Sequence, residues 1–244
     1  MARKPTPPAA EPPPATPPPR RRRSHAGRIV AAVAAATTAT GLGVGLYHSG
    51  KPTAPKVCQV SSIDPKQEQP LKFWAPPAGK SCKPTQKGAY LLPDPNCTPG
   101  AVNPTLTLTV LKDKDYSTGP CVRDKATSAS RKSDTYGWYG IVSPPGNTGK
   151  TQTCEKDHLI SLELGGADTL DNIWPQCGPD NTALNQRNFK QKDMVENYLA
   201  AQVRSGGIDL GTAQHGIATD WTQYLQPAKD WYAKEGGIKN DDEG

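Results

Sequence analysis

The sequence lacks several features that would assign it to a protein class at once. No two of its six cysteines are separated by only two residues, which argues against a structural zinc site built from Cys-x-x-Cys pairs. The segment Gly149-Lys150-Thr151 has no glycine five residues before its Gly-Lys pair, so it is not a phosphate-binding P-loop. The apolar share is only 34% and prolines number 26, so part of the chain is not expected to pack into a core.

Beyond its first 50 residues the chain also lacks net charge. Residues 1–50 contain seven of the 29 Lys and Arg residues and one of the 23 acids, which leaves 22 of each for residues 51–244. The formal charge of +6 therefore belongs to the N-terminal segment. A domain that binds nucleic acid would need a local basic strip, or a bound metal, to hold phosphate.

The N-terminal part is predicted to stay outside the folded domain. Residues 1–27 are rich in proline and end in four arginines, 20–23, so we expect a disordered tail. Residues 28–48 include an uncharged run, 29–47, which is close to the length of a bilayer-spanning helix. Because the arginines precede this run, the tail is expected in the cytoplasm and the domain in the periplasm or outside the cell. Cleavage of the run as a signal peptide, which would give a secreted protein, stays open.

All six cysteines follow the apolar run, which indicates three disulfides in an oxidising compartment. Cys154 and Cys177 flank a proposed hairpin and are expected to pair. Sequence proximity suggests Cys97–Cys121 and Cys58–Cys82 for the others, among the 15 pairings that six cysteines allow.

Residues 49–90 read as a Pro-rich linker, residues 105–110 as an exposed-face strand, and residues 231–244 as a flexible tail.

Residues 154–203 predict a hairpin followed by a helix. Ile160, Leu162 and Leu164 alternate as on one face of a strand, and Gly165-Gly166 supplies a turn. Residues 172–174 begin a second short strand that Pro175 would end. Apolar residues from 189 to 203 recur at the spacing of one helical face, and further helices are expected over about 128–139 and from Leu210 to about Trp221.

Three motifs in this segment resemble the HNH endonuclease, or ββα-metal, superfamily, in particular an exported bacterial branch. They are Asp157-His158-Leu-Ile-x-Leu-x-Leu-Gly-Gly, Asn172-Ile-Trp-Pro and Lys192-Asp193-x-x-Glu196. Flanking matches extend the resemblance over residues 92–224. It implies an α+β fold with a ββα-metal core and additional helices in a domain spanning residues 91–230, preceded by the disordered tail and a single transmembrane helix.

The resemblance also implies roles for individual residues. His158 would be the general base, Asp157 the first metal ligand, and Asn172 the residue that holds the histidine-bearing loop and fixes the imidazole tautomer. Lys190 stands where relatives commonly carry His or Asn, and a protonated lysine cannot ligate a cation. Asn188, Asp193 and Glu196 are therefore the candidates for the remaining ligands. Such an oxygen-rich set favours Mg²⁺ or Mn²⁺.

The resulting expectation is a metal-dependent endonuclease that hydrolyses nucleic acid, DNA in preference to RNA, on the outer side of a membrane, which it contacts through residues 28–48. Two alternatives stay open. The domain could be a catalytically inactive, exported HNH-like binding module, or a structural protein of the cell envelope. The sequence leaves the oligomeric state undetermined.

Overall fold

The computed structural model describes residues 58–60, 63, 71–123 and 129–235, all of which belong to one compact unit spanning residues 52–244. The tail expected over residues 1–27 and the membrane span expected over 28–48 lie outside these ranges. Within them, no helix combines the length and the apolar character needed to span a bilayer.

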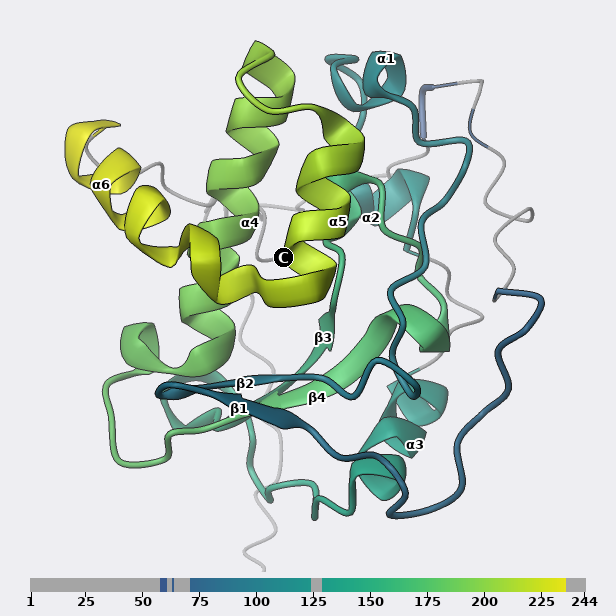
Figure 1. Ribbon diagram of the computed structural model, residues 1–244, viewed down its shortest axis with the longest axis vertical. Helices are drawn as coiled ribbons and strands as arrows, with labels where there is room; N and C mark the ends of the chain where they lie inside the picture. The colour runs from purple at the N-terminus through teal and green to yellow at the C-terminus, as the bar shows by residue number, and fades with distance from the viewer. Residues whose placement is uncertain (1–57, 61–62, 64–70, 124–128, 236–244) are drawn as a thin grey trace, which may run out of the picture. The chain divides into compact units, whose positions relative to one another are not determined.

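The described chain is a mixed α+β structure with two separate two-stranded antiparallel sheets (Figure 1). One sheet pairs β1 with β2, and the other pairs β3 with β4. In chain order the elements are β1 (Thr85–Lys87), β2 (Tyr90–Leu92), α1 (Leu108–Leu111), α2 (Thr118–Cys121), α3 (Ala129–Tyr139), β3 (Cys154–His158), β4 (Ile173–Cys177), α4 (Asn188–Ser205), α5 (Leu210–Asp220) and α6 (Leu225–Glu235). The helices expected after residues 128, 189 and 210 are confirmed as α3, α4 and α5.

The hairpin β3–β4 is shorter than the sequence predicted. Its register pairs Cys154 with Cys177 and His158 with Ile173, so the first strand ends at His158. The apolar alternation at Ile160, Leu162 and Leu164 is not a strand, because residues 162–164 form a short 3₁₀ helix. All three side chains are buried, but Leu162 packs in a different cluster from the other two.

Pro175 lies inside β4 and does not end it. A two-stranded sheet leaves one edge of each strand unpaired, and a proline is tolerated where its missing N–H would face that edge. The turn glycine was predicted correctly: Gly165 has a left-handed φ of 76°.

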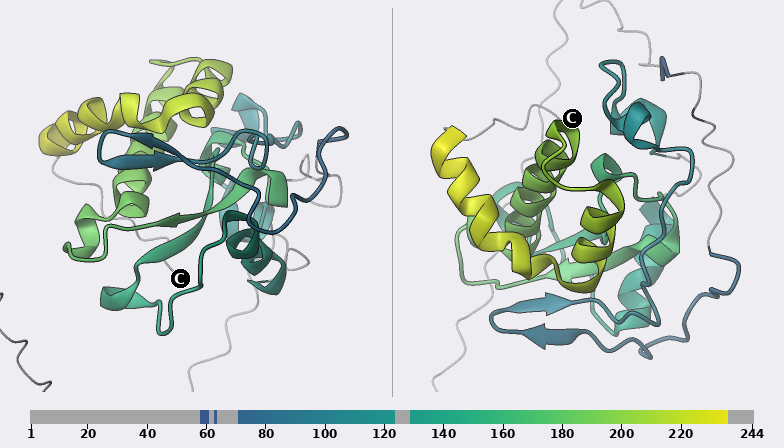
Figure 2. Two further views of the ribbon diagram at one scale, coloured as in Figure 1. Left: turned by 60° about the horizontal axis from the view of Figure 1, so that its bottom comes forward. Right: turned by 45° about the horizontal axis from the view of Figure 1, so that its top comes forward.

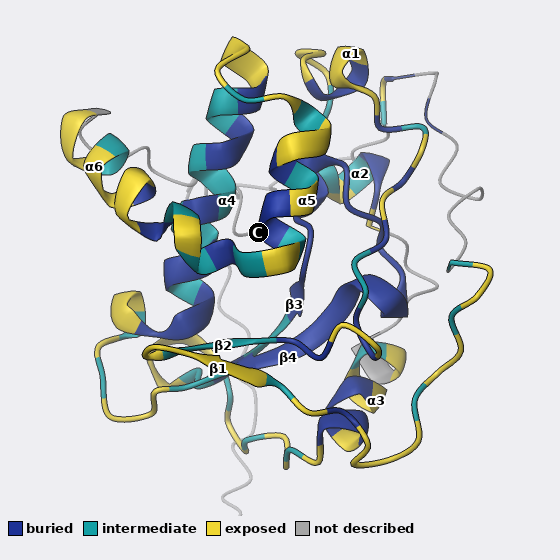
Figure 3. Cartoon of the chain, in the orientation of Figure 1, coloured by how far each residue is buried: buried dark blue, intermediate teal, exposed yellow. Residues whose placement is uncertain are grey.

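The main core lies between α4 and the C-terminal helices. Val195, Leu199 and Val203 of α4 pack with Ile217 of α5 and with Trp221. Figure 2 shows α5 and α6, the last two helices in the colour sequence, beside α4 in both views. The buried faces of α4 and α5 are dark blue in Figure 3. Trp174 and Trp221 are both fully buried, as expected of core residues.

The prediction of a strand over residues 105–110 is wrong. This segment begins α1, which Thr107 caps by accepting a hydrogen bond from the Val110 backbone N–H. Its alternating threonines and apolar residues have no neighbouring strand to pair with among the described residues. The local N-cap therefore decides the conformation.

Much of the expected linker 49–90 contributes to the fold. Cys82 is buried and bonded to Cys97, and the Trp74 indole donates to the Cys97 carbonyl oxygen at 2.9 Å. At the other end, α6 includes the first five residues of the expected tail 231–244.

The disulfides are Cys58–Cys121, Cys82–Cys97 and Cys154–Cys177. The hairpin pairing is thus confirmed. The pairings Cys58–Cys82 and Cys97–Cys121 are wrong, because Cys58 lies in the apolar cluster of α1 and α2 whereas Cys82 lies with the cluster beneath α3.

Candidate functional site

Asp157 and His158 are neighbours at the end of β3, and their side chains contact different parts of the molecule. The Asp157 carboxylate lies 2.8 Å from the Lys192 ammonium of α4. The His158 imidazole lies 2.7 Å from Asp168, in the loop that joins β3 to β4. Successive residues of a strand point to opposite faces, and β3 follows that rule to its last residue. The two side chains are therefore directed to different partners.

The first group of polar residues, which we call the imidazole cluster, consists of His158, Asp168 and Lys132. One carboxylate oxygen of Asp168 is 2.7 Å from Nε2 of His158 and 2.6 Å from the ammonium of Lys132. The Asp168 side chain is fully buried. Although burial favours its neutral form, the hydrogen bond with His158 and the ammonium of Lys132 lower the pKa of Asp168. Asp168 is therefore a carboxylate.

The charge state of His158 follows from its surroundings. Burial is the main cause that lowers the pKa of His158 to about 4, and the nearby cations Lys132 and Arg123 lower it further, against the opposing effect of Asp168. The imidazole is thus neutral near pH 7. A carboxylate can only accept hydrogen bonds. Nε2 must therefore carry the proton and donate a hydrogen bond to Asp168. The lone pair of the ring is then on Nδ1, where it can accept a proton from water.

Asn172 acts on the backbone of the loop between β3 and β4. Its Oδ1 accepts from the Ile160 N–H at 2.9 Å, and its Nδ2 donates to the carbonyl oxygens of Ile160 and Ala167 at 2.9 and 2.8 Å. The expected role in holding this loop matches these contacts. The expected contact with the imidazole does not, because Asp168 is the partner of His158. Asn172 positions Asp168 indirectly, since Ala167 directly precedes it.

The sequence reasoning missed Asp168, Lys132 and Arg123. Asp168 lies ten residues beyond His158 and only two beyond the Gly165-Gly166 pair. A hairpin turn at those glycines would return an acidic side chain toward the histidine, so a signal was available. Lys132 and Arg123 had none, because they reach the site from segments distant in sequence.

The second group, which we call the ammonium cluster, consists of Asp157, Lys192 and Glu196. Lys192 is fully buried. Its ammonium pairs with both carboxylates and donates to the His158 backbone carbonyl oxygen at 2.6 Å. A lysine on a helix surface is ordinarily solvated, whereas the Lys192 side chain is fully buried.

The other predicted metal ligands have hydrogen-bond or ion-pair partners outside the ammonium cluster. Asn188 donates to the Cys177 carbonyl oxygen at 3.1 Å, which ties the start of α4 to the end of β4. Asp193 pairs with the Lys190 ammonium at 3.0 Å. Of the helix residues proposed as ligands, Glu196 shares the Lys192 ammonium with Asp157, and the charge of Asp193 acts on Asp157 as well.

This arrangement does not fit the divalent cation that the resemblance implies. The carboxylates of Asp157 and Glu196 already contact a buried ammonium, which would repel a second cation. Within residues 58–60, 63, 71–123 and 129–235, no group of three His, Cys, Asp or Glu side chains is placed to hold a metal.

Glu155 lies on the same face of β3 as Asp157. Burial raises the pKa of Glu155 to about 7, and the neighbouring carboxylates of Asp193 and Asp157 add to the effect. Acidic side chains are therefore concentrated on the α4 side of the hairpin, where few cations are available to pair with them.

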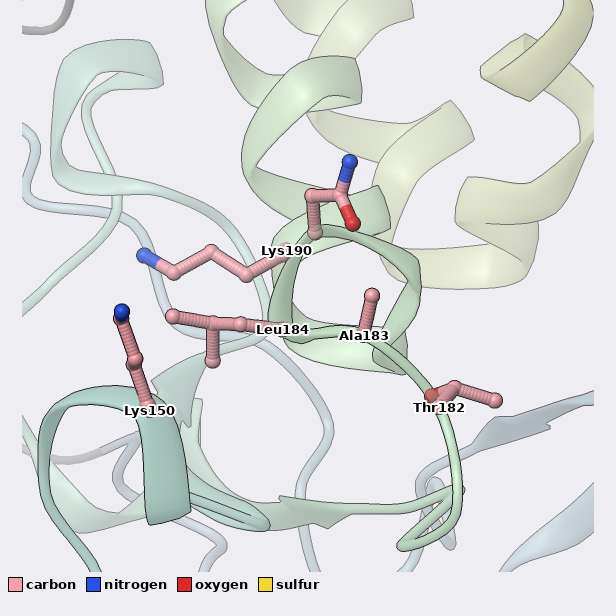
Figure 4. Close-up of a pocket in the computed structure, with 6 residues that line it drawn as sticks. Lys150, Thr182, Ala183, Leu184 and Lys190 are labelled. Atoms are coloured by element: carbon pink, nitrogen blue, oxygen red, sulfur yellow. The ribbon is translucent and has the colours of Figure 1, made fainter.

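A cavity of about 540 Å³ lies at the start of α4, and none of its lining residues belongs to either cluster (Figure 4). In Figure 4 the side chains of Lys150 and Lys190 extend to the same side of this cavity, next to Leu184. The pocket thus combines an apolar wall with positive charge.

Comparisons of the chain with protein-family models, with curated proteins and with solved structures found no match.

Proposed function

We propose that this chain is a hydrolase that cleaves nucleic-acid phosphodiester bonds, with His158 as the general base. The observation that carries the proposal is the neutral imidazole held by an ionised Asp168, with the ammonium of Lys132 on the same carboxylate. The order β3, β4, α4, with Asp157-His158 ending the first strand, supports an HNH-like ββα core.

In the proposed reaction, Nδ1 of His158 takes a proton from a water molecule as its oxygen attacks phosphorus. Asp168 stabilises the imidazolium that forms, because its carboxylate already accepts from Nε2. The bond from phosphorus to the leaving oxygen breaks, and that oxygen takes a proton from solvent. Lys132 and Arg123 provide the local positive charge that a neutral domain needs to hold a phosphate.

DNA is the proposed substrate, with RNA the second choice. Three disulfides support an oxidising compartment for the domain, and hence the outward orientation inferred from the N-terminal arginines. The proposed membrane anchor, residues 28–48, lies outside the described residues.

The decisive experiment incubates the purified full chain with supercoiled plasmid, in EDTA and separately with Mg²⁺ or Mn²⁺. We expect nicking that His158→Ala lowers by about 10²–10⁴-fold, the usual contribution of a general base. The matched control is His215→Ala, because His215 is an exposed histidine of α5 far from the imidazole cluster in sequence. Equal nicking by both variants would refute the role of His158.

The inactive binding module remains a second candidate because the His158 side chain is only 10% exposed, so a substrate has little access to it. The same preparation decides between the two. Plasmid retardation in a gel without nicking under any condition would support the binding module.

A further inference from the structure

Lys192 has the contacts of a bound cation rather than those of a surface lysine. Its ammonium meets three oxygens, from the side chains of Asp157 and Glu196 and from the His158 backbone. Lys192 donates hydrogen bonds to Glu196 and to the His158 carbonyl oxygen, and it forms an ion pair with Asp157 at 2.8 Å. Two of the three oxygens belong to carboxylates, which is the composition of a site for a hard cation.

The positive charge of Lys192 is retained in this buried place. Burial of a lone ammonium favours its neutral form. Here the carboxylates of Asp157 and Glu196 outweigh burial, and the pKa of Lys192 lies above its ordinary value. Two carboxyl groups share one ammonium here. Burial and the neighbouring Asp157 raise the pKa of Glu196 well above its ordinary value, so the three side chains titrate as one unit.

The ammonium has little freedom to leave. Lys192 is the fifth residue of α4, and Phe189, Val195 and Leu199 on the same helix are fully buried. A divalent cation that approached Asp157 and Glu196 would meet a fixed positive charge at low dielectric. Displacement of the ammonium would break its contacts with all three oxygens.

We propose that the Lys192 ammonium is the resident cation of this site, in the place where a divalent metal would otherwise bind between β3 and α4. A consequence, which rests on the proposed hydrolase function, is that phosphodiester cleavage persists in EDTA. The occupancy of the site by Lys192 does not depend on that function.

The test measures metal binding and not activity. Any bound metal is removed from the full chain with EDTA, followed by dialysis. The chain is then titrated with Mn²⁺. Free Mn²⁺ is followed by electron paramagnetic resonance, and the melting temperature is recorded. We expect no stoichiometric binding and no shift for the natural chain. Lys192→Asn replaces the ammonium with a neutral amide oxygen and should bind one Mn²⁺. Its melting temperature should then rise by about 5–10 °C at roughly 100-fold excess over Kd.

Lys229→Asn is the matched control, because Lys229 is an exposed lysine of α6 and lies outside the ammonium cluster. This variant should behave like the natural chain. The proposal is overturned if the natural chain binds one Mn²⁺ and Glu196→Gln abolishes that binding. It is equally overturned if Lys192→Asn folds and binds none.

Should Lys192→Asn fail to fold, the titration of the natural chain still decides. The plasmid assay tests the hydrolase proposal independently. If the chain cleaves no plasmid, the hydrolase proposal is refuted, whereas the proposal that Lys192 occupies the site is unaffected. Cleavage that requires Mn²⁺ bound at Asp157 refutes the resident ammonium and leaves the hydrolase standing.

Discussion

At the scale of single residues, the environment of His158 has a consequence for stability as well as for catalysis. Its pKa is about 4 in the folded chain, against about 6.5 for an unperturbed histidine. The unfolded chain therefore binds more protons in this interval. The stabilising contribution of the neutral imidazole is complete above about pH 6.5 and disappears as the pH falls toward 4.

We predict that the free energy of unfolding of the natural chain, relative to that of His158→Gln, decreases by up to about 3 kcal/mol between pH 7 and pH 4. Urea denaturation across this range measures the difference. Glu155 contributes the opposite slope, since its raised pKa of about 7 favours the folded state at low pH. That slope is present in both proteins and cancels. Parallel curves for the two proteins would contradict a buried, neutral His158.

At the scale of elements, the loop between β3 and β4 fixes the distance from His158 to Asp168. Asn172 binds the loop from inside, and Gly166 lets the backbone pass close to Ile160. A Cβ atom at position 166 would lie 1.9 Å from the Ile160 carbonyl oxygen and 2.9 Å from Nδ2 of Asn172. No side chain rotation relieves a clash with backbone, so the loop would have to move.

Gly166→Ala is accordingly predicted to lower the free energy of unfolding by about 2–4 kcal/mol, through overpacking and loss of the Asn172 hydrogen bonds. The measurement is the urea midpoint at pH 7. Gly137→Ala is the control, because a Cβ atom there has no neighbour within 4 Å and Gly137 lies inside α3. This second change should stabilise the chain by up to about 1 kcal/mol. Similar losses for both variants would show that the close approach at Gly166 is unimportant.

At the scale of the whole molecule, the disulfides join parts of the chain that the two small sheets do not connect. Cys58–Cys121 closes 63 residues and attaches the start of the described chain to α2, whereas Cys82–Cys97 closes 15. Closing a longer loop removes more conformational entropy from the unfolded chain.

Replacement of Cys58 and Cys121 together by serine should therefore cost about 4 kcal/mol, and the same change at Cys82 and Cys97 about 3 kcal/mol. Denaturation of the two double variants gives these values. Mass spectrometry of peptides from the unreduced chain should recover the pairs 58–121, 82–97 and 154–177. Recovery of 58–82 or 97–121 would contradict the packing of both segments.

The sequence by itself determined the local features: the turn at Gly165, the extents of α3, α4 and α5, and the Cys154–Cys177 pair that closes the hairpin. Each depends on residues near one another in the chain, so periodicity and turn chemistry suffice to predict it. Residues 105–110 show the limit, since alternation predicts a strand only where a partner strand is available.

Only the tertiary structure decided which groups meet. The single strand β3 sends Asp157 toward Lys192 and His158 toward Asp168 and Lys132. The resemblance to the HNH superfamily assigned Asp157 and His158 to one site. The pleat separates adjacent residues, and packing brings together residues from distant segments, so the imidazole cluster and the ammonium cluster exist only in the folded chain.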